Sequence, residues 1–168
     1  MELFFLPPIS LAGEKNSAVS ANNQFAFDLY SKYKSKEGNI FYSPYSISSA
    51  LAMTYEGARG QTAQQMQAVL HFPENATVRR ESYSALDREI NKKDKDYTLK
   101  TANALWALDK YPFRKEYFDL IEKYYGGKTT NLDFIHQPEQ CRLIINKWVE
   151  DQTYEKIKNL IPEGLITK

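Results

Sequence analysis

The stretch from Asn39 to Thr62 reads NIFYSPYSISSALAMTYEGARGQT and contains three structural signals in succession. Residues 39–42 are rich in the β-branched and aromatic residues that favour a strand. Ser43 and Pro44 end that strand and open a helix, because proline fits the first helical turn. Gly57 and Gly60 end the helix. We therefore predict a short strand over 39–42 followed by a helix from Pro44.

The predicted helix has an unusual composition. Its apolar stripe is formed by Ile47, Ala50, Leu51 and Thr54. Small side chains keep the rest of the helix thin, namely Ser48, Ser49, Ala50 and Ala52. A helix built from small residues can approach its neighbours closely, so we expect it to lie near the centre of the fold.

Helical periodicity continues on both sides of this stretch. Ser17 or Ser20 can cap a helix that ends near Gly38, and Thr62 is expected to cap a short helix that carries Met66 and Val69. Residues 77–93 form an amphipathic pattern whose charged side mixes both signs; that side comprises Arg79, Arg80, Arg88, Lys92 and Lys93 with Glu81, Asp87 and Glu89. A face of mixed charge is usually solvated, and a polyanion site there is the less favoured interpretation.

The second half of the chain alternates strands and helices. Residues 99–108 read as a strand covered on much of both faces, and residues 129–134 as a second strand. Between them, a helix around Phe118 ends at Gly126-Gly127. Pro138 opens a last helix with a packed apolar stripe, formed by Cys141, Ile144, Ile145, Trp148 and Val149.

Composition narrows the function classes. The 168 residues include 22 basic and 21 acidic side chains, and this near-neutrality argues against a nucleic-acid partner. No apolar run approaches the roughly 20 residues that span a bilayer, which argues against a membrane partner. Residues 1–17 form an N-terminal extension that is either a disordered tail or a segment docked through Phe4, Phe5 and Leu6.

The search for chemistry yields no catalytic, cofactor-binding or metal-binding residue. His71 and His136 belong to no catalytic or metal-binding motif. Cys141 is a possible nucleophile with His136, although a buried cysteine that packs like an apolar residue is favoured. Asp133 and His136 form either an acid–base couple or an ordinary polar turn at a strand end, and the turn is favoured. No cofactor is expected.

Small polar residues next to predicted core positions are the remaining signal. They are Asn39, Ser43, Ser46, Asn103 and Asn146. A buried hydroxyl or amide without a partner costs about 1–3 kcal/mol, so such residues suggest an internal hydrogen-bonded network. That network either only supplies hydrogen-bond partners to buried polar groups or acts as a latch between two arrangements of a sheet. The residues alone leave both interpretations open.

Three motifs resemble the serpin superfamily. They are the 39–62 stretch, Ala102-Asn103-Ala104-Leu105-Trp106, and Ile145-Asn146-Lys147-Trp148-Val149-Glu150 followed by Thr153. They occur in family order. The resemblance implies an α+β serpin fold with three β-sheets, in which residues 18–168 are the N-terminal half of a single domain. This chain would supply the first six helices, one strand of a second sheet and two strands of the large sheet.

The resemblance also implies a function. The protein would be a serine protease inhibitor that acts as a suicide substrate: its reactive loop is cleaved, the acyl-enzyme is trapped and the loop inserts into the large sheet of a metastable fold. Asn39, Ser43, Ser46 and Asn146 would form the conformational shutter where that sheet opens. The reactive centre would be absent from this chain. The alternative is a non-inhibitory serpin, acting as a binding protein or chaperone.

The implied partners are a trypsin-, chymotrypsin- or subtilisin-like serine protease and the C-terminal remainder of the same serpin. The family resemblance favours an extracellular location, while the single cysteine and the lack of a clear leader fit a cytoplasmic one as well. A third hypothesis, from a different class, is a small hydrolase that uses Cys141 and His136.

Overall fold

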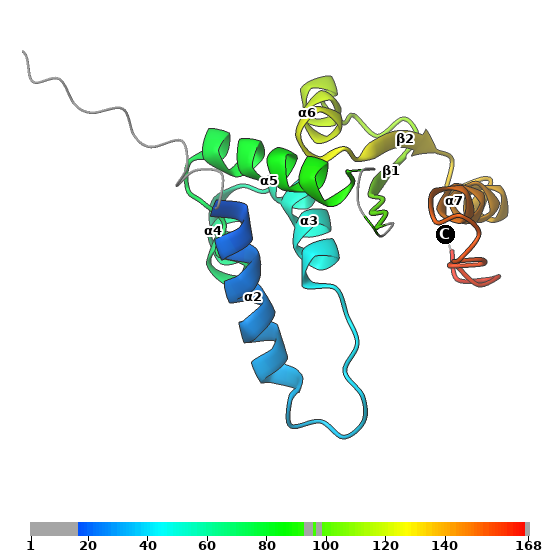
Figure 1. The fold of residues 1–168 in the computed structure, drawn as a ribbon. Helices are drawn as coiled ribbons and strands as arrows, with labels where there is room; N and C mark the ends of the chain where they lie inside the picture. The colour runs from blue at the N-terminus through cyan, green and yellow to red at the C-terminus, as the bar shows by residue number, and fades with distance from the viewer. Residues whose placement is uncertain (1–16, 93–95, 97–98, 167–168) are drawn as a thin grey trace, which may run out of the picture.

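The computed structural model describes residues 17–92, 96 and 99–166. The expectations for Phe4, Phe5 and Leu6 lie outside the described residues. Along the chain, the described part contains six helices and two strands (Figure 1). It is an α+β arrangement, as the sequence predicts. None of its helices is long and apolar enough to cross a membrane.

The first two helices follow the capping signals. Helix α2 spans Ser17–Tyr33 and helix α3 spans Pro44–Tyr55. Ser43 is the N-cap of α3, and its side chain accepts a hydrogen bond from the backbone N–H of Ser46. The predicted strand over 39–42 is wrong: these residues form part of the long connection from α2, visible in Figure 1. A strand needs a hydrogen-bonded partner strand. Among the described residues, no strand pairs with this segment.

The buried face of α3 also differs from the predicted one. Its buried residues are Ser48, Ser49, Ala52 and Met53, whereas Ala50, Leu51 and Thr54 are exposed. The small-residue signal was correct, because Ser48 and Ala52 are fully buried. The predicted stripe left out Ser48 and Ser49, whose polar side chains are of a kind that is mostly exposed in proteins. Inside this fold they are buried with hydrogen-bond partners.

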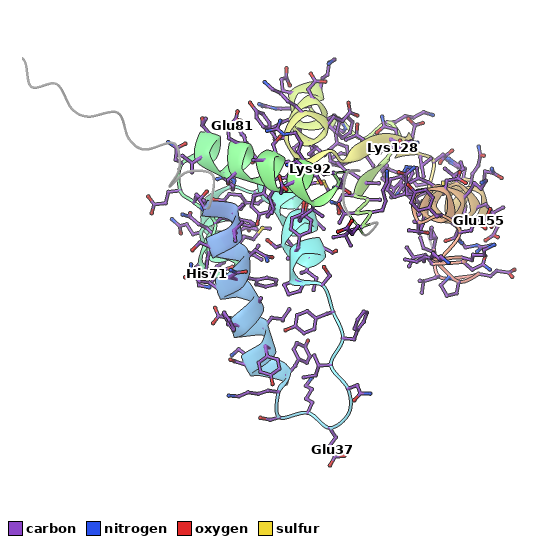
Figure 2. The ribbon with its side chains drawn as sticks, viewed as in Figure 1. Glu37, His71, Glu81, Lys92, Lys128 and Glu155 are labelled. Atoms are coloured by element: carbon purple, nitrogen blue, oxygen red, sulfur yellow. The ribbon has the colours of Figure 1, made fainter. Side chains whose placement is uncertain are left out.

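Helices α4 and α5 pack against α2. Helix α4 spans Gly60–Leu70 and α5 spans Ala76–Ile90, so the expected end at Lys93 is three residues too late. Arg59 rather than Thr62 is the N-cap of α4. His71, labelled in Figure 2, follows α4. Its Nε2 lies 2.7 Å from Oδ2 of Asp28 in α2. This hydrogen bond ties the end of α4 to α2.

The sheet has two parallel strands joined by a helix. Strand β1 spans Ala104–Leu108, helix α6 spans Lys115–Tyr125 and strand β2 spans Lys128–Leu132. Parallel strands require a crossover connection, and α6 supplies it. Both strands are shorter than predicted, because only the residues that find a ladder partner become strand. Gly126, with a φ of 61°, ends α6 in the left-handed conformation that glycine adopts readily.

Apolar residues form two clusters. The larger one joins α2, α3, α5 and α6, with Phe25, Met53, Tyr83 and Ile121 among its buried members. The smaller one packs α7, which spans Pro138–Gln152, against β2 through residues such as Cys141. Large apolar side chains nevertheless remain exposed; Phe41 is 101% exposed. In Figure 1, α7 lies on the opposite side of the sheet from α2.

Candidate functional site

Of the polar residues predicted as a shutter, the structure brings two together. Ser46 Oγ lies 2.9 Å from Ser43 Oγ, and the Ser46 backbone N–H donates to Ser43 Oγ at 3.2 Å. Both side chains are exposed in the described part of the chain. The pair forms the first turn of α3, and local sequence is enough to produce it, because Ser-Pro starts a helix and position N3 lies opposite the cap.

Asn39 and Asn146 lie elsewhere. Asn39 is exposed in the connection between α2 and α3. Asn146 is buried on α7, where its side chain accepts a hydrogen bond from the Ile161 N–H at 2.8 Å and donates one to the Ile161 carbonyl at 2.9 Å. Within the described residues, no hydrogen bond joins either asparagine to the Ser43–Ser46 pair. Asn146 therefore anchors the segment after α7.

A second polar contact joins α3 to the residue preceding β1. Asn103 Nδ2 donates to Ser49 Oγ at 3.3 Å. On the same buried face, Ser48 Oγ is hydrogen-bonded to the Tyr83 hydroxyl of α5. Burial raises the pKa of Tyr83 to about 12, so its hydroxyl stays protonated. Ser48, Ser49 and Tyr83 were missed at the sequence level, although the run of small residues in α3 contained the signal.

The largest buried ionic group was also missed. Glu56, at the end of α3, has a side chain that is 1% exposed. Its Oε1 accepts from Arg79 Nη2 at 3.1 Å and from the Tyr125 hydroxyl at 2.7 Å. Its Oε2 accepts from Arg80 Nη2 at 2.7 Å. Three elements, α3, α5 and α6, thus meet on one carboxylate.

Electrostatics keep that carboxylate ionised. Burial opposes ionisation, but hydrogen bonds from Arg80 and Tyr125 and the charges of Arg79 and Arg80 hold the pKa of Glu56 below its usual value. The same contact raises the pKa of Tyr125, whose burial contributes most. The assignment of Arg79 to a solvated face is therefore wrong. Arg79 lies at helical spacing from Tyr83 and Leu86, which places it on the inner face of α5.

The possible hydrolase residues do not form a nucleophile–base pair. Cys141 is buried with Leu132 and Ile145, and this burial raises the pKa of its thiol, which disfavours the reactive thiolate. His136 is 72% exposed and its Nδ1 lies 2.9 Å from Asp133 Oδ1. Asp133 also accepts the His136 backbone N–H at 3.0 Å. This is the geometry of a polar turn after β2, which is the favoured interpretation of these two residues.

No group of three or more His, Cys, Asp or Glu side chains within residues 17–92, 96 and 99–166 is arranged to hold a metal ion. The described site is therefore a set of structural hydrogen bonds and ion pairs around α3. Such a set can hold a helix against a sheet and can be broken and remade.

Comparison with known proteins identifies the family. The model of the family described as "Serpin (serine protease inhibitor)" matches residues 20–168, so the chain belongs to the serpin family. It is 46% identical over 153 residues to an uncharacterized serpin-like protein of Methanosarcina mazei, covering 89% of this chain and 36% of that protein. It is 42% identical over 149 residues to the leukocyte elastase inhibitor of Bos taurus, covering 88% and 39%.

A solved structure confirms the fold. Reactive-loop-cleaved human thyroxine-binding globulin matches with a TM-score of 0.76 and 28% identity, over 89% of this chain and 45% of that one. The chain therefore has a partial serpin fold, in agreement with the sequence-based expectation. It spans 36–45% of the length of these three proteins.

Proposed function

We propose that this chain is the N-terminal half of a complete serpin that inhibits a serine protease as a suicide substrate. In this mechanism the protease cleaves the reactive loop, the acyl-enzyme is trapped and the loop inserts into the large sheet. Insertion requires the sheet to part above α3. Serpins are mostly inhibitors rather than enzymes, and one relative of this chain is named as an elastase inhibitor.

The observation that best supports this proposal is the contact between α3 and the start of β1. Asn103, the residue before β1, donates to Ser49 on the buried face of α3. A hydrogen bond of this kind contributes about 1 kcal/mol net, so it can be exchanged for another at modest cost. Small side chains, namely Ser48, Ser49 and Ala52, also make up most of that buried face, beside Met53. Both properties suit a sheet that must open.

The test is incubation of the complete protein with trypsin-, chymotrypsin-, subtilisin- and elastase-type proteases. An SDS-resistant complex with the mass of protease plus inhibitor is the expected result. The matched control is the same protease with its catalytic serine chemically blocked, which should give no such complex. Cleavage of the loop without a complex would overturn the inhibitory function.

A non-inhibitory binding serpin is the second candidate, and the similarity to thyroxine-binding globulin favours it specifically. The two are distinguished by the same incubation, because a binding serpin is cleaved without trapping the protease. The extracellular location expected from the family is tested by fractionating the source cells. Recovery of the protein only in the cell interior would contradict it.

The shutter role of Ser46 has its own test. Ser46 is exposed in the described residues. A phenylalanine there would therefore clash only with the C-terminal remainder of the serpin, which the proposal places over Ser46. We expect Ser46→Phe in the complete protein to lower the melting temperature and speed polymerisation. Ser35→Phe, at an exposed position in the connection after α2, is the control. An unchanged melting profile and monomeric state for Ser46→Phe would contradict the shutter role.

A further inference from the structure

A concave groove of about 800 Å³ lies beside the buried Glu56 cluster. It is bounded by the end of α3, by α5, by the connection between β1 and α6, and by the first half of α6. This volume is in the range of sites that hold drug-sized molecules. The proposed inhibitory function uses none of its residues.

Three arginines line this groove: Arg59, Arg80 and Arg114. Arg59 Nη1 donates to the backbone carbonyls of Glu56 at 3.0 Å and Ala58 at 2.7 Å, which holds the guanidinium in place. Among the described residues, no hydrogen bond uses its Nε or Nη2. Arg59 therefore has donors left for a ligand in the groove. Among the described residues, no salt bridge to a carboxylate offsets its positive charge.

The other two arginines also keep donors available. Arg80 donates to Glu56 Oε2 through its Nε and Nη2, and no described residue accepts a hydrogen bond from its Nη1. Arg114 is exposed at the N-cap of α6 and makes no side-chain capping bond. Both carboxylate oxygens of Glu56 already accept hydrogen bonds, from Arg79, Arg80 and Tyr125. The second carboxylate that lines the groove is Glu116. The groove therefore has an excess of positive charge.

The remaining wall is aromatic and apolar. The Phe113 and Tyr117 rings are nearly parallel, with 16° between their planes and 6.3 Å between their centroids. Tyr117 is held in place, because its hydroxyl donates to the Met53 carbonyl at 3.1 Å. Phe113 is 38% exposed, so its ring is accessible, and Leu120 extends the apolar surface.

We propose that this groove binds a small organic anion with a flat aromatic body, such as an aryl carboxylate. The carboxylate would pair with Arg59 and Arg114, because a guanidinium matches a carboxylate with two parallel hydrogen bonds. The aromatic body would lie against Phe113 and Tyr117. A polysaccharide polyanion fits less well, since it would place no apolar surface on that wall and would meet Glu116.

The proposal is tested by isothermal titration of the complete protein with 2-naphthoate, using 2-naphthamide as the uncharged control of the same shape. Naphthoate should bind at least about tenfold more tightly than naphthamide, because a hydrogen bond to a charged group contributes about 1.5–3 kcal/mol. Phe113→Ala should weaken both ligands. No detectable heat with millimolar naphthoate, or equal affinity for both ligands, would overturn the proposal.

Matched variants locate the site. Arg59→Gln and Arg114→Gln should each weaken naphthoate binding about tenfold. Arg114→Gln should leave thermal unfolding unchanged, because the Arg114 side chain is exposed and makes no capping bond. Arg88→Gln removes an exposed arginine of α5 that does not line the groove, and should bind naphthoate like the parent protein. If Arg59→Gln also lowers the melting temperature, the naphthoate affinity of Arg114→Gln alone decides whether the site is assigned correctly. Undiminished naphthoate binding by Arg114→Gln would place the ligand elsewhere and refute the assignment.

Discussion

Replacing Glu56 by glutamine should destabilise the protein strongly. Glutamine has nearly the same size, so the packing of α3, α5 and α6 is retained and only the negative charge is lost. The Arg79 side chain is 5% exposed, and in Glu56→Gln it would remain as a buried cation without its anion. Removing one partner of a buried ion pair costs about 3–5 kcal/mol.

The geometry supports that magnitude. In the parent protein, Arg80 donates to Oε2 through both Nε and Nη2, at 3.2 Å and 2.7 Å. If the glutamine oxygen keeps the contacts of Oε1, its amide nitrogen faces those two donors. The loss of even one charged hydrogen bond costs about 1.5–3 kcal/mol, and the uncompensated charge of Arg79 adds to it.

The same substitution should change the pH dependence of stability. The pKa of Glu56 is lower in the folded protein than its ordinary value of 4.5, so the folded state favours the ionised form. Its contribution is fully present above pH 4.5 and is lost as the pH falls through the folded pKa. The stability of Glu56→Gln should therefore depend less on pH than that of the parent protein below pH 4.5.

The assay is urea unfolding of the complete protein, followed by circular dichroism and by tryptophan fluorescence to check that the two transitions coincide. Glu81→Gln is the control, because Glu81 is an exposed residue of the same helix as Arg79 (Figure 2). It should change the unfolding free energy by less than about 0.5 kcal/mol. A loss below about 1 kcal/mol for Glu56→Gln would refute the role given to the buried carboxylate.

Three further outcomes are expected. Asn146→Ala should cost about 1–2 kcal/mol in the same urea assay, because the Ile161 N–H loses its acceptor while the Ile161 carbonyl keeps only its hydrogen bond from Arg142 Nη1; no change would show that water replaces the side chain. Gly127→Ala should lower the melting temperature, with a cost of about 1–3 kcal/mol, since a Cβ there would lie 2.6 Å from Met53 Sδ; an unchanged melting temperature would mean that Met53 moves aside freely. Cys141 should react with a thiol reagent only in denaturant, as judged by mass spectrometry, and rapid native labelling would contradict its burial.

Local features of the fold were predictable because their causes lie within a few residues. Ser43 caps α3 as expected, since a hydroxyl followed by proline favours a helix start wherever it occurs. Pro138 opens α7, and Gly126 ends α6, for equally local reasons. The buried residues Cys141 and Ile145 of α7 follow from the spacing of its apolar residues.

The candidate site was predicted only in part. Ser43 and Ser46 lie together because they are three residues apart at a helix start. Asn146 is expected from the sequence next to core positions and is buried in the structure, but its partner Ile161 follows an irregular segment whose course has no local signature. The segment 39–42 has strand composition without forming a strand in the described residues, because pairing depends on a partner from elsewhere.

The sequence by itself determined where most helices begin or end and, through three motifs, the serpin family. Capping, proline and glycine effects act over a few residues, and so they can be read directly from the chain. The tertiary structure alone decided that Glu56 meets Arg79, 23 positions away, and Tyr125, 69 positions away. It also decided that serines form the buried face of α3. Burial and charge pairing depend on which elements pack together, and that is a property of the whole fold.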